Sequence, residues 1–230
     1  MSIPENYISN SATMKLNMRV DQILKNNNDN QELILTLKGK DKNKLSLILE
    51  LVIMVLTITG VSLFQNQADV VLIICWAFIG IYTWLSKRYD TFTHFIISTC
   101  FAFLWVWFAR NNYGYNYAYF SVAGLNLLPI AAWSMGLLFV SEILNHLSIE
   151  KIILRLLVFT LLYWCALIAL ETYAFHVIGI RNISTGNSNG LPFCNCIHAP
   201  WWMRIVYFSM GPIYYIITII ADKFAGKKRA

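Results

Sequence analysis

The sequence predicts an all-α integral membrane protein, a bundle of six transmembrane helices with both termini on the cytoplasmic side. The chain of 230 residues is 57% hydrophobic and 13% charged, whereas about a quarter of the residues in an ordinary soluble domain are charged. Six apolar stretches approach the ~20 residues that a helix needs to cross the hydrocarbon core. Lysine and arginine are distributed unevenly between the connecting segments, as in multi-pass membrane proteins.

These stretches divide the chain into a polar arm, a membrane domain and a tail. Residues 1–44 form an arm rich in Asn, Lys and Asp, and residues 223–230 form a basic cytoplasmic tail. The arm contains no early apolar segment, so we expect no cleavable signal peptide, and the first span serves as its own insertion signal. The spans of the membrane domain (45–222) are expected at 45–64, 69–86, 92–109, 118–142, 152–171 and 203–221.

The fourth and fifth spans carry features that affect their geometry. Pro129 lies in the middle of the fourth span, where a proline removes a backbone donor and bends a helix. We therefore expect a tilted or kinked helix, with the freed carbonyl satisfied by other helices. The fifth span can continue to Ile180, which would place Glu171 inside the membrane.

Positive charge sets the orientation. With both termini inside, all of the 18 Lys and Arg residues except Arg110, Arg181 and Arg204 lie in cytoplasmic segments, which agrees with the positive-inside rule. The loops 111–119 and 172–202 then share the extracytoplasmic face. Because topology explains the net charge of +6, we exclude nucleic acid as a partner. The expected partners are membrane lipids, and both another membrane protein and a second copy of this chain stay open. In a bacterium the membrane would be the cytoplasmic one.

The segment 171–203 gathers the polar groups that are suited to chemistry. A carboxylate at membrane depth is costly, so Glu171 is expected to face protein or water and to find a partner. His176 and Arg181 are the candidates for that partner, and the three residues form the predicted catalytic set. In the functional interpretation Glu171 is a general acid or a proton-handling group. In the alternative it only ends the span at the membrane interface.

A second pattern in this segment is Cys194-Asn-Cys196-Ile-His198. Alternate residues of an extended chain face the same way, so Cys194, Cys196 and His198 could hold zinc or copper, with His176 as a fourth ligand. Buried inert thiols, or a disulfide to a partner chain, are the alternatives. A disulfide between Cys194 and Cys196 is disfavoured because one intervening residue leaves a small strained ring. The sequence identifies no other cofactor.

Two parts of the chain echo each other and predict an internal repeat. Gly124, Pro129 and Trp133 in one half correspond to a second set, Gly190, Pro192 and Trp201-Trp202, in the other. Duplicated halves of membrane proteins often build a site between them. Trp133, Tyr117 and Trp202 are the predicted substrate-binding residues, because aromatic faces stabilise cations.

The same motifs resemble a known family. The Gly/Tyr loop Tyr113–Tyr119, followed by Leu128-Pro129 and Trp133, is similar to a stretch of the membrane carotenoid hydratases and lycopene cyclase-like proteins. Glu171-Thr172-Tyr173-Ala174, then Gly179 and Gly190-Leu191-Pro192, resembles their second half. The resemblance implies a helical bundle that protonates or cyclises a long polyene with intramembrane carboxylates. Where those cyclases have adjacent acidic residues, this chain has Phe193, Cys194 and Asn195.

Three functions fit this composition. The first is a membrane enzyme acting on an apolar lipid or isoprenoid, the second is a transporter or channel subunit for a small solute or ion, and the third is a non-catalytic subunit or assembly factor. An apolar cavity that reaches Glu171 favours the enzyme. A continuous polar path favours transport, and the absence of both favours the subunit.

Overall fold

A computed structural model describes residues 48–226 except residue 148. The chain divides into two units, Met1–Ile48 and Leu49–Ala230, and the account below concerns the second. The predicted polar arm and the last four residues of the predicted tail lie outside the described residues.

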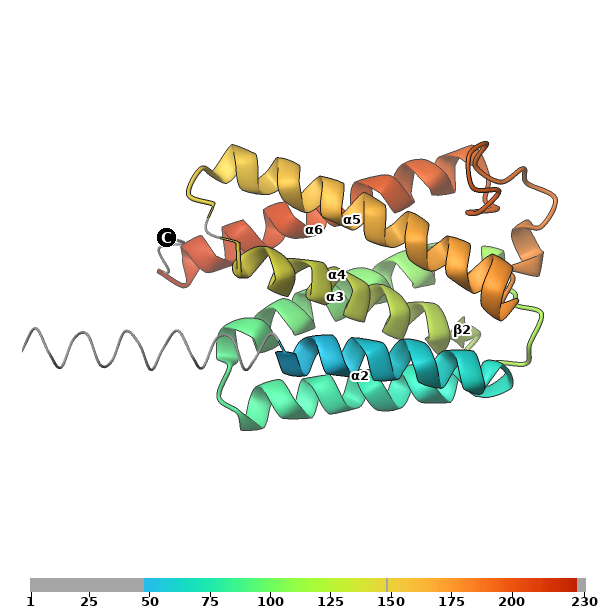
Figure 1. Cartoon of the computed structure of the whole chain (residues 1–230), viewed down its shortest axis with the longest axis horizontal. Helices are drawn as coiled ribbons and strands as arrows, with labels where there is room; N and C mark the ends of the chain where they lie inside the picture. The colour runs from blue at the N-terminus through green and yellow to red at the C-terminus, as the bar shows by residue number, and fades with distance from the viewer. Residues whose placement is uncertain (1–47, 148, 227–230) are drawn as a thin grey trace, which may run out of the picture. The chain divides into compact units, whose positions relative to one another are not determined.

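Within the described residues, five helices are long and apolar enough to cross a membrane. A sixth apolar helix, called here the N-terminal helix, is described over Ile48–Leu63, and this described part is shorter than each of the five long helices. The five long helices are α2 (Ala68–Leu85), α3 (Tyr89–Phe108), α4 (Leu127–Asn145), α5 (Ile152–Tyr173) and α6 (Trp201–Phe224). The 3-10 turn η1 (Gln65–Gln67) precedes α2 directly, and the π turn η3 (Ala174–Ile178) continues α5. Short 3-10 turns, η2 (Arg110–Asn112) and η4 (Ile183–Thr185), lie in the loops. The helices confirm the coarse prediction of an all-α, multi-pass membrane fold (Figure 1).

Helix α4 is the central element of the bundle. It packs against α2, α3 and α5 (Figure 1). Of the residues in its most apolar stretch of 18, 61% are buried. In each of the other four long helices a smaller share of the corresponding stretch is buried, because more of their apolar surface faces outward. Leu137 and Leu144 on α4 are fully buried. The other close pairs of long helices are α5 with α6, α2 with α3, and α3 with α6.

The predicted fourth span is wrong at its start. Helix α4 begins at Leu127, and the residues before it form a hairpin of β1 (Ser121–Val122) and β2 (Leu125–Asn126). The side chain of Asn126 caps the helix by accepting a hydrogen bond from the Leu128 amide at 3.0 Å. Pro129 therefore lies in the first turn, where no intrahelical donor is needed, and the expected kink has no cause.

At Pro129 we expected a carbonyl group that a neighbouring helix would have to satisfy. Such a carbonyl occurs instead near Pro212, which lies inside α6. Proline has no amide hydrogen, so the carbonyl of Phe208, one turn earlier, lacks its helical donor. The indole Nε1 of Trp164 on α5 donates to this carbonyl at 2.8 Å. A neighbouring helix thus satisfies the group that the proline leaves open, as the membrane environment requires.

Close packing of α5 on α6 occurs at the adjacent residue, Gly211. A Cβ at this position would overlap the ring of Tyr163, and the Tyr163 hydroxyl donates to the backbone carbonyl of Tyr207. The ring of Tyr163 therefore lies directly on the α6 backbone. The two helices approach this closely because glycine has no side chain.

The loops 111–119 and 172–202 meet at one end of the bundle, as the predicted topology requires. Tyr115 forms an antiparallel bridge with Asn182. The Asn116 amide donates to the Arg181 carbonyl at 3.1 Å, and the Arg181 amide donates to Asn116 Oδ1 at 2.7 Å. We call this the loop end of the bundle, and the end with the turns 86–88 and 146–151 the turn end.

Replacing Trp164 with Phe is expected to destabilise the fold by about 1–3 kcal/mol, the cost of leaving the Phe208 carbonyl of a membrane-spanning helix without a donor. In a Pro212→Ala background the backbone donor returns, so the same change is expected to cost little. Thermal unfolding of the two single variants and the double variant in detergent measures this coupling. Equal costs in both backgrounds would contradict the proposed pairing.

Gly211→Ala is expected to lower stability by about 1–2 kcal/mol, because overpacking against Tyr163 outweighs the better helix propensity of alanine. Gly136→Ala on α4 is the matched control, since a Cβ there meets no atom within 4 Å. We expect this control to be neutral or slightly stabilising in the same thermal unfolding measurement. A neutral Gly211→Ala would show that Tyr163 moves aside freely.

Candidate functional site

The main cavity of the described residues lies between the N-terminal helix, α4 and α5, and has a volume of about 590 Å³. This volume falls within the range of small-molecule sites, about 300–1,000 Å³. Along α4 its lining runs from Leu128 to Glu142, about 20 Å at 1.5 Å per residue. Most of the wall is aliphatic, with Ile53, Ile58, Val61, Leu72, Leu137, Leu138, Leu167 and Leu170 among the lining residues. Polar groups line its two ends.

At the loop end the cavity reaches Glu171, in the last turn of α5. No hydrogen bond or ion pair joins this carboxylate to another residue of the described chain. Four tyrosines that line the same cavity interact electrostatically with it, namely Tyr113, Tyr115, Tyr163 and Tyr207. A carboxyl group placed in this way is available to whatever occupies the cavity.

The tyrosines form part of an aromatic network. Trp105 Nε1 donates to the Tyr113 hydroxyl at 2.7 Å, and this hydroxyl lies 3.1 Å from that of Tyr207. The ring of Trp133 packs 5.0 Å from the ring of Tyr207. Burial raises the pKa of Tyr113 and Tyr115 above its usual value, and the Glu171 carboxylate raises it further. Both loop tyrosines are therefore neutral phenols at physiological pH.

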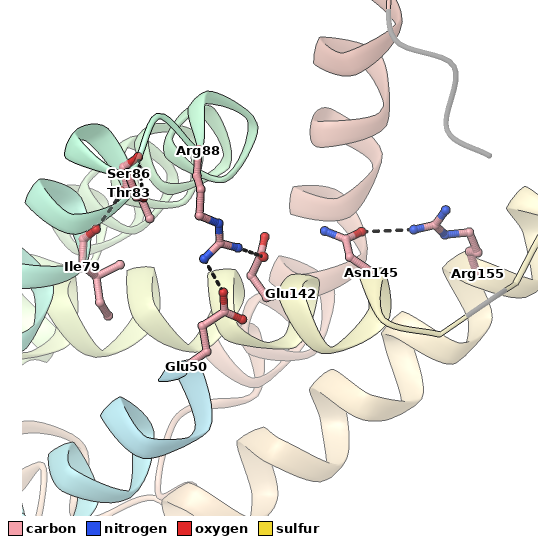
Figure 2. Close-up of polar contacts among 8 residues, drawn as sticks. All are labelled: Glu50, Ile79, Thr83, Ser86, Arg88, Glu142, Asn145 and Arg155. Atoms are coloured by element: carbon pink, nitrogen blue, oxygen red, sulfur yellow. Dashed lines mark hydrogen bonds and ion pairs between the residues drawn. The ribbon is translucent and has the colours of Figure 1, made fainter. Parts of the chain in front are cut away.

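At the turn end the cavity is lined by a partly buried charge cluster. Figure 2 shows the contacts within this cluster. Arg88, between α2 and α3, contacts Glu50 of the N-terminal helix at 2.6 Å and Glu142 of α4 at 2.7 Å. Burial lowers the pKa of Arg88, but the Glu142 and Glu50 carboxylates outweigh it and the net shift is upward. Nearby, Arg155 donates to Asn145 at 3.1 Å and joins α5 to α4. The sequence analysis did not predict this cluster. It counted Arg88 only as one of the positive charges that indicate the orientation in the membrane.

His176 and Arg181, the predicted partners of Glu171, lie elsewhere. His176 is exposed, and its Nε2 forms a hydrogen bond with the Cys194 carbonyl at 2.9 Å. The guanidinium of Arg181 lies over the ring of Phe175, 4.7 Å from its centroid. The structure therefore does not bring the predicted catalytic set together. Arg181 follows a turn of the chain at Gly179, whose φ is 80°, and the His176 side chain is bonded to the Cys194 carbonyl instead.

Of the predicted substrate-binding residues, Trp133 lines the cavity. Tyr117 instead donates to Gln65 Oε1 at 3.3 Å, and Trp202 packs against Trp105 at 6.1 Å. Neither is among the residues that line the cavity. The sequence reasoning missed Tyr113, Tyr115, Tyr163 and Tyr207 as wall residues. The alternation of tyrosines from 113 to 119 is the signal that could have identified the first two.

The predicted repeat has no counterpart in the local geometry of the two segments. Pro129 lies inside the first turn of α4, whereas Pro192 lies in a loop well before α6 begins at Trp201. The first segment is a hairpin, and the second contains the two cysteines. The two segments therefore enter their helices in different ways.

Cys194 and Cys196 form a disulfide, which the sequence argument disfavoured. The bond closes because the backbone turns tightly, with φ of 45° at Asn195 and 53° at Ile197, and asparagine tolerates the left-handed region better than most residues. Paired sulfurs are not thiolate ligands. No group of three or more His, Cys, Asp or Glu side chains in the described residues could hold a metal ion, so the arrangement does not favour the predicted site with His198.

His198, the third residue of that predicted set, lies in the wall of the main cavity. Its ring stacks on Phe175 with centroids 4.3 Å apart. Burial lowers the pKa of His198, and the neighbouring Arg204, His176 and Arg181 lower it further. The imidazole is therefore neutral at pH 7.

Comparison with protein-family models, with curated proteins and with solved structures finds no match to this chain. The functional argument consequently depends on the geometry of the site.

Replacing Arg88 with Met is expected to destabilise the fold by about 1.5–3 kcal/mol, because the buried Glu142 and the partly buried Glu50 lose their common cation. Adding Glu142→Gln should recover part of this loss by removing one of the two charges. Lys87→Met, at an exposed neighbouring position, is the matched control and should leave the unfolding midpoint unchanged. A similar loss in the control would show that the turn, not the cluster, is sensitive.

Proposed function

We propose that this protein is a membrane-embedded enzyme that acts on an elongated apolar lipid or isoprenoid, with Glu171 as general acid. The observation that carries the proposal is the apolar cavity of about 590 Å³ that reaches a carboxyl group with no ion-pair or hydrogen-bond partner among the described residues. The proposal includes six membrane spans with both termini in the cytoplasm. In this topology the loop end lies on the extracytoplasmic side of the membrane.

The proposed reaction begins with the proton of Glu171. A carboxylic acid in apolar surroundings retains its proton and can transfer it to a carbon–carbon double bond of the substrate. The double bond supplies the electron pair for the new C–H bond, the neighbouring carbon becomes a cation, and Glu171 becomes a carboxylate. Loss of a proton from an adjacent carbon to the Glu171 carboxylate then completes an isomerisation, and attack of a second double bond on the cation before that loss completes a cyclisation. Capture of water, followed by transfer of one of its protons to Glu171, completes a hydration.

The rings around Glu171 suit such an intermediate. Aromatic faces attract cations through their quadrupole, and Tyr113, Trp133 and Tyr207 lie together at this end of the cavity. The aliphatic wall excludes water, which would otherwise capture the cation early. The length of the cavity, about 20 Å along α4 at 1.5 Å per residue, suits a chain rather than a compact molecule.

Transport of protons or a small ion is the second candidate. His94 on α3 and Asp222 on α6 form a buried contact at 3.1 Å, and ionisable pairs inside spans often mark ion pathways. The pair is not part of the cavity wall, however, and the wall between the Arg88 cluster and Glu171 is mainly apolar. The cavity therefore supports an apolar occupant better than an ion.

The test compares lipids and pigments, by mass spectrometry, from cells expressing the wild type or Glu171→Gln in hosts that make isoprenoid precursors. We expect a product that depends on Glu171, and its rate of formation should fall at least ~100-fold in the variant, the usual contribution of a general acid. Glu150→Gln is the control, because Glu150 is exposed at the turn end.

Identical profiles in hosts with and without the protein, with precursor present, would contradict the enzyme proposal. Proton or ion flux into vesicles containing the purified protein, sensitive to His94→Gln, would then favour the second candidate.

A further inference from the structure

The disulfide at the loop end joins a partly exposed cysteine, Cys194, to a buried one, Cys196. Cys194 is half-buried, with exposed residues on both sides of it in sequence. Cys196 is 0% exposed and belongs to the hydrophobic core. A reagent arriving from solvent therefore meets Cys194 first. This asymmetry is what thiol–disulfide exchange requires, because attack must be directed at one sulfur while the other leaves.

The surroundings of the disulfide are basic. The sequence from 172 to 202 contains no Asp or Glu. His176 contacts the backbone of Cys194 directly, and Arg204, His176 and Arg181 all act electrostatically on His198, two residues after Cys196. Positive charge stabilises thiolates, so the guanidinium groups of Arg181 and Arg204 favour both an attacking thiolate and the thiolate that leaves.

The disulfide also fixes a segment of the cavity wall. Ile197 and His198, which follow Cys196 directly, line the main cavity at its loop end. The segment is held further by hydrogen bonds, from the Leu191 amide to the Cys196 carbonyl at 2.8 Å and from Arg204 to the carbonyls of Ala199 and Asn189. Opening the disulfide frees the tight backbone turn at Asn195, which lies directly before this wall segment in the chain.

We propose that Cys194–Cys196 is a redox-exchange site for a dithiol reductant, and that its reduction loosens the wall formed by Ile197 and His198. The proposal goes beyond the acid chemistry at Glu171, since it concerns a second reaction and a different class of reactant.

The exchange balances in two steps. One thiolate of the dithiol attacks Cys194 Sγ, the Cys194–Cys196 bond breaks, and Cys196 leaves as a thiolate that takes up a proton. The second thiol of the reductant loses its proton and displaces Cys194 from the mixed disulfide. The products are two cysteine thiols and the oxidised, cyclic or bridged, form of the dithiol. Two electrons pass from the reductant to the protein.

The test uses the full chain with Cys75, Cys100 and Cys165 replaced by Ala, so that Cys194 and Cys196 are the only cysteines. Dithiothreitol is added to the folded protein, and new thiols are counted by alkylation and mass spectrometry. We expect both thiols to appear while helix content, measured by circular dichroism, is unchanged. With 2-mercaptoethanol and an acid quench, peptide mapping should place the adduct on Cys194.

The effect of the basic side chains is tested by measuring the rate at which dithiothreitol reduces the disulfide. Arg181→Gln should slow reduction several-fold, whereas Arg110→Gln should not, since Arg110 stacks on Trp107 instead. Hydrogen exchange of residues 190–200 should increase on reduction, and Cys196→Ser should show the same increase without reductant. The double variant Cys194→Ser with Cys196→Ser should not respond to dithiothreitol.

Reduction that occurs only when the helices unfold would overturn the proposal and leave a structural cross-link. Adducts equally distributed over both sulfurs would overturn the assignment of Cys194 as the attacked residue, and unchanged hydrogen exchange would overturn the link to the wall. None of these measurements needs a substrate, so their outcome is separate from that of the Glu171 experiment.

Discussion

A hydrocarbon environment requires every polar group to find its partner inside the protein, and much of this structure follows from that requirement. Trp164 donates to the carbonyl that Pro212 leaves without a helical donor. Side-chain hydroxyls inside the helices donate to carbonyls one turn earlier in their own helix, as in Thr57, Ser62, Thr83 and Thr160. Glu171 departs from this pattern among the described residues.

The two ends of the cavity treat charge differently. At the turn end Arg88 joins two carboxylates and thereby links the N-terminal helix, the α2–α3 turn and α4. At the loop end a single carboxyl lies among phenols and an indole, with no cation paired to it. The first arrangement stabilises the fold, because without Arg88 two neighbouring carboxylates repel each other. The second has no such link between helices.

Sequence reasoning predicted what depends on composition along the chain. The apolar stretches of α2, α3, α5 and α6 gave helix positions close to the observed ones, and the charge distribution indicated which loops would share an end. It failed where local context decides. Asn126 caps α4 after a hairpin, so Pro129 lies at a helix start. Asn195 adopts a left-handed backbone and closes a disulfide. The cavity wall depends on which helix faces meet, and no single span encodes this.

The consecutive residues Tyr163 and Trp164 of α5 donate to the consecutive carbonyls of Tyr207 and Phe208 of α6, and Tyr163 also lies on Gly211. Two adjacent bonds and a seated ring prevent either helix from rotating or sliding past the other, so the pair moves as one rigid body. The opposite wall is also anchored, because Glu50 and Ser62 join the N-terminal helix to Arg88 and to Tyr173 of α5. Widening the cavity therefore requires the loss of polar contacts on either side.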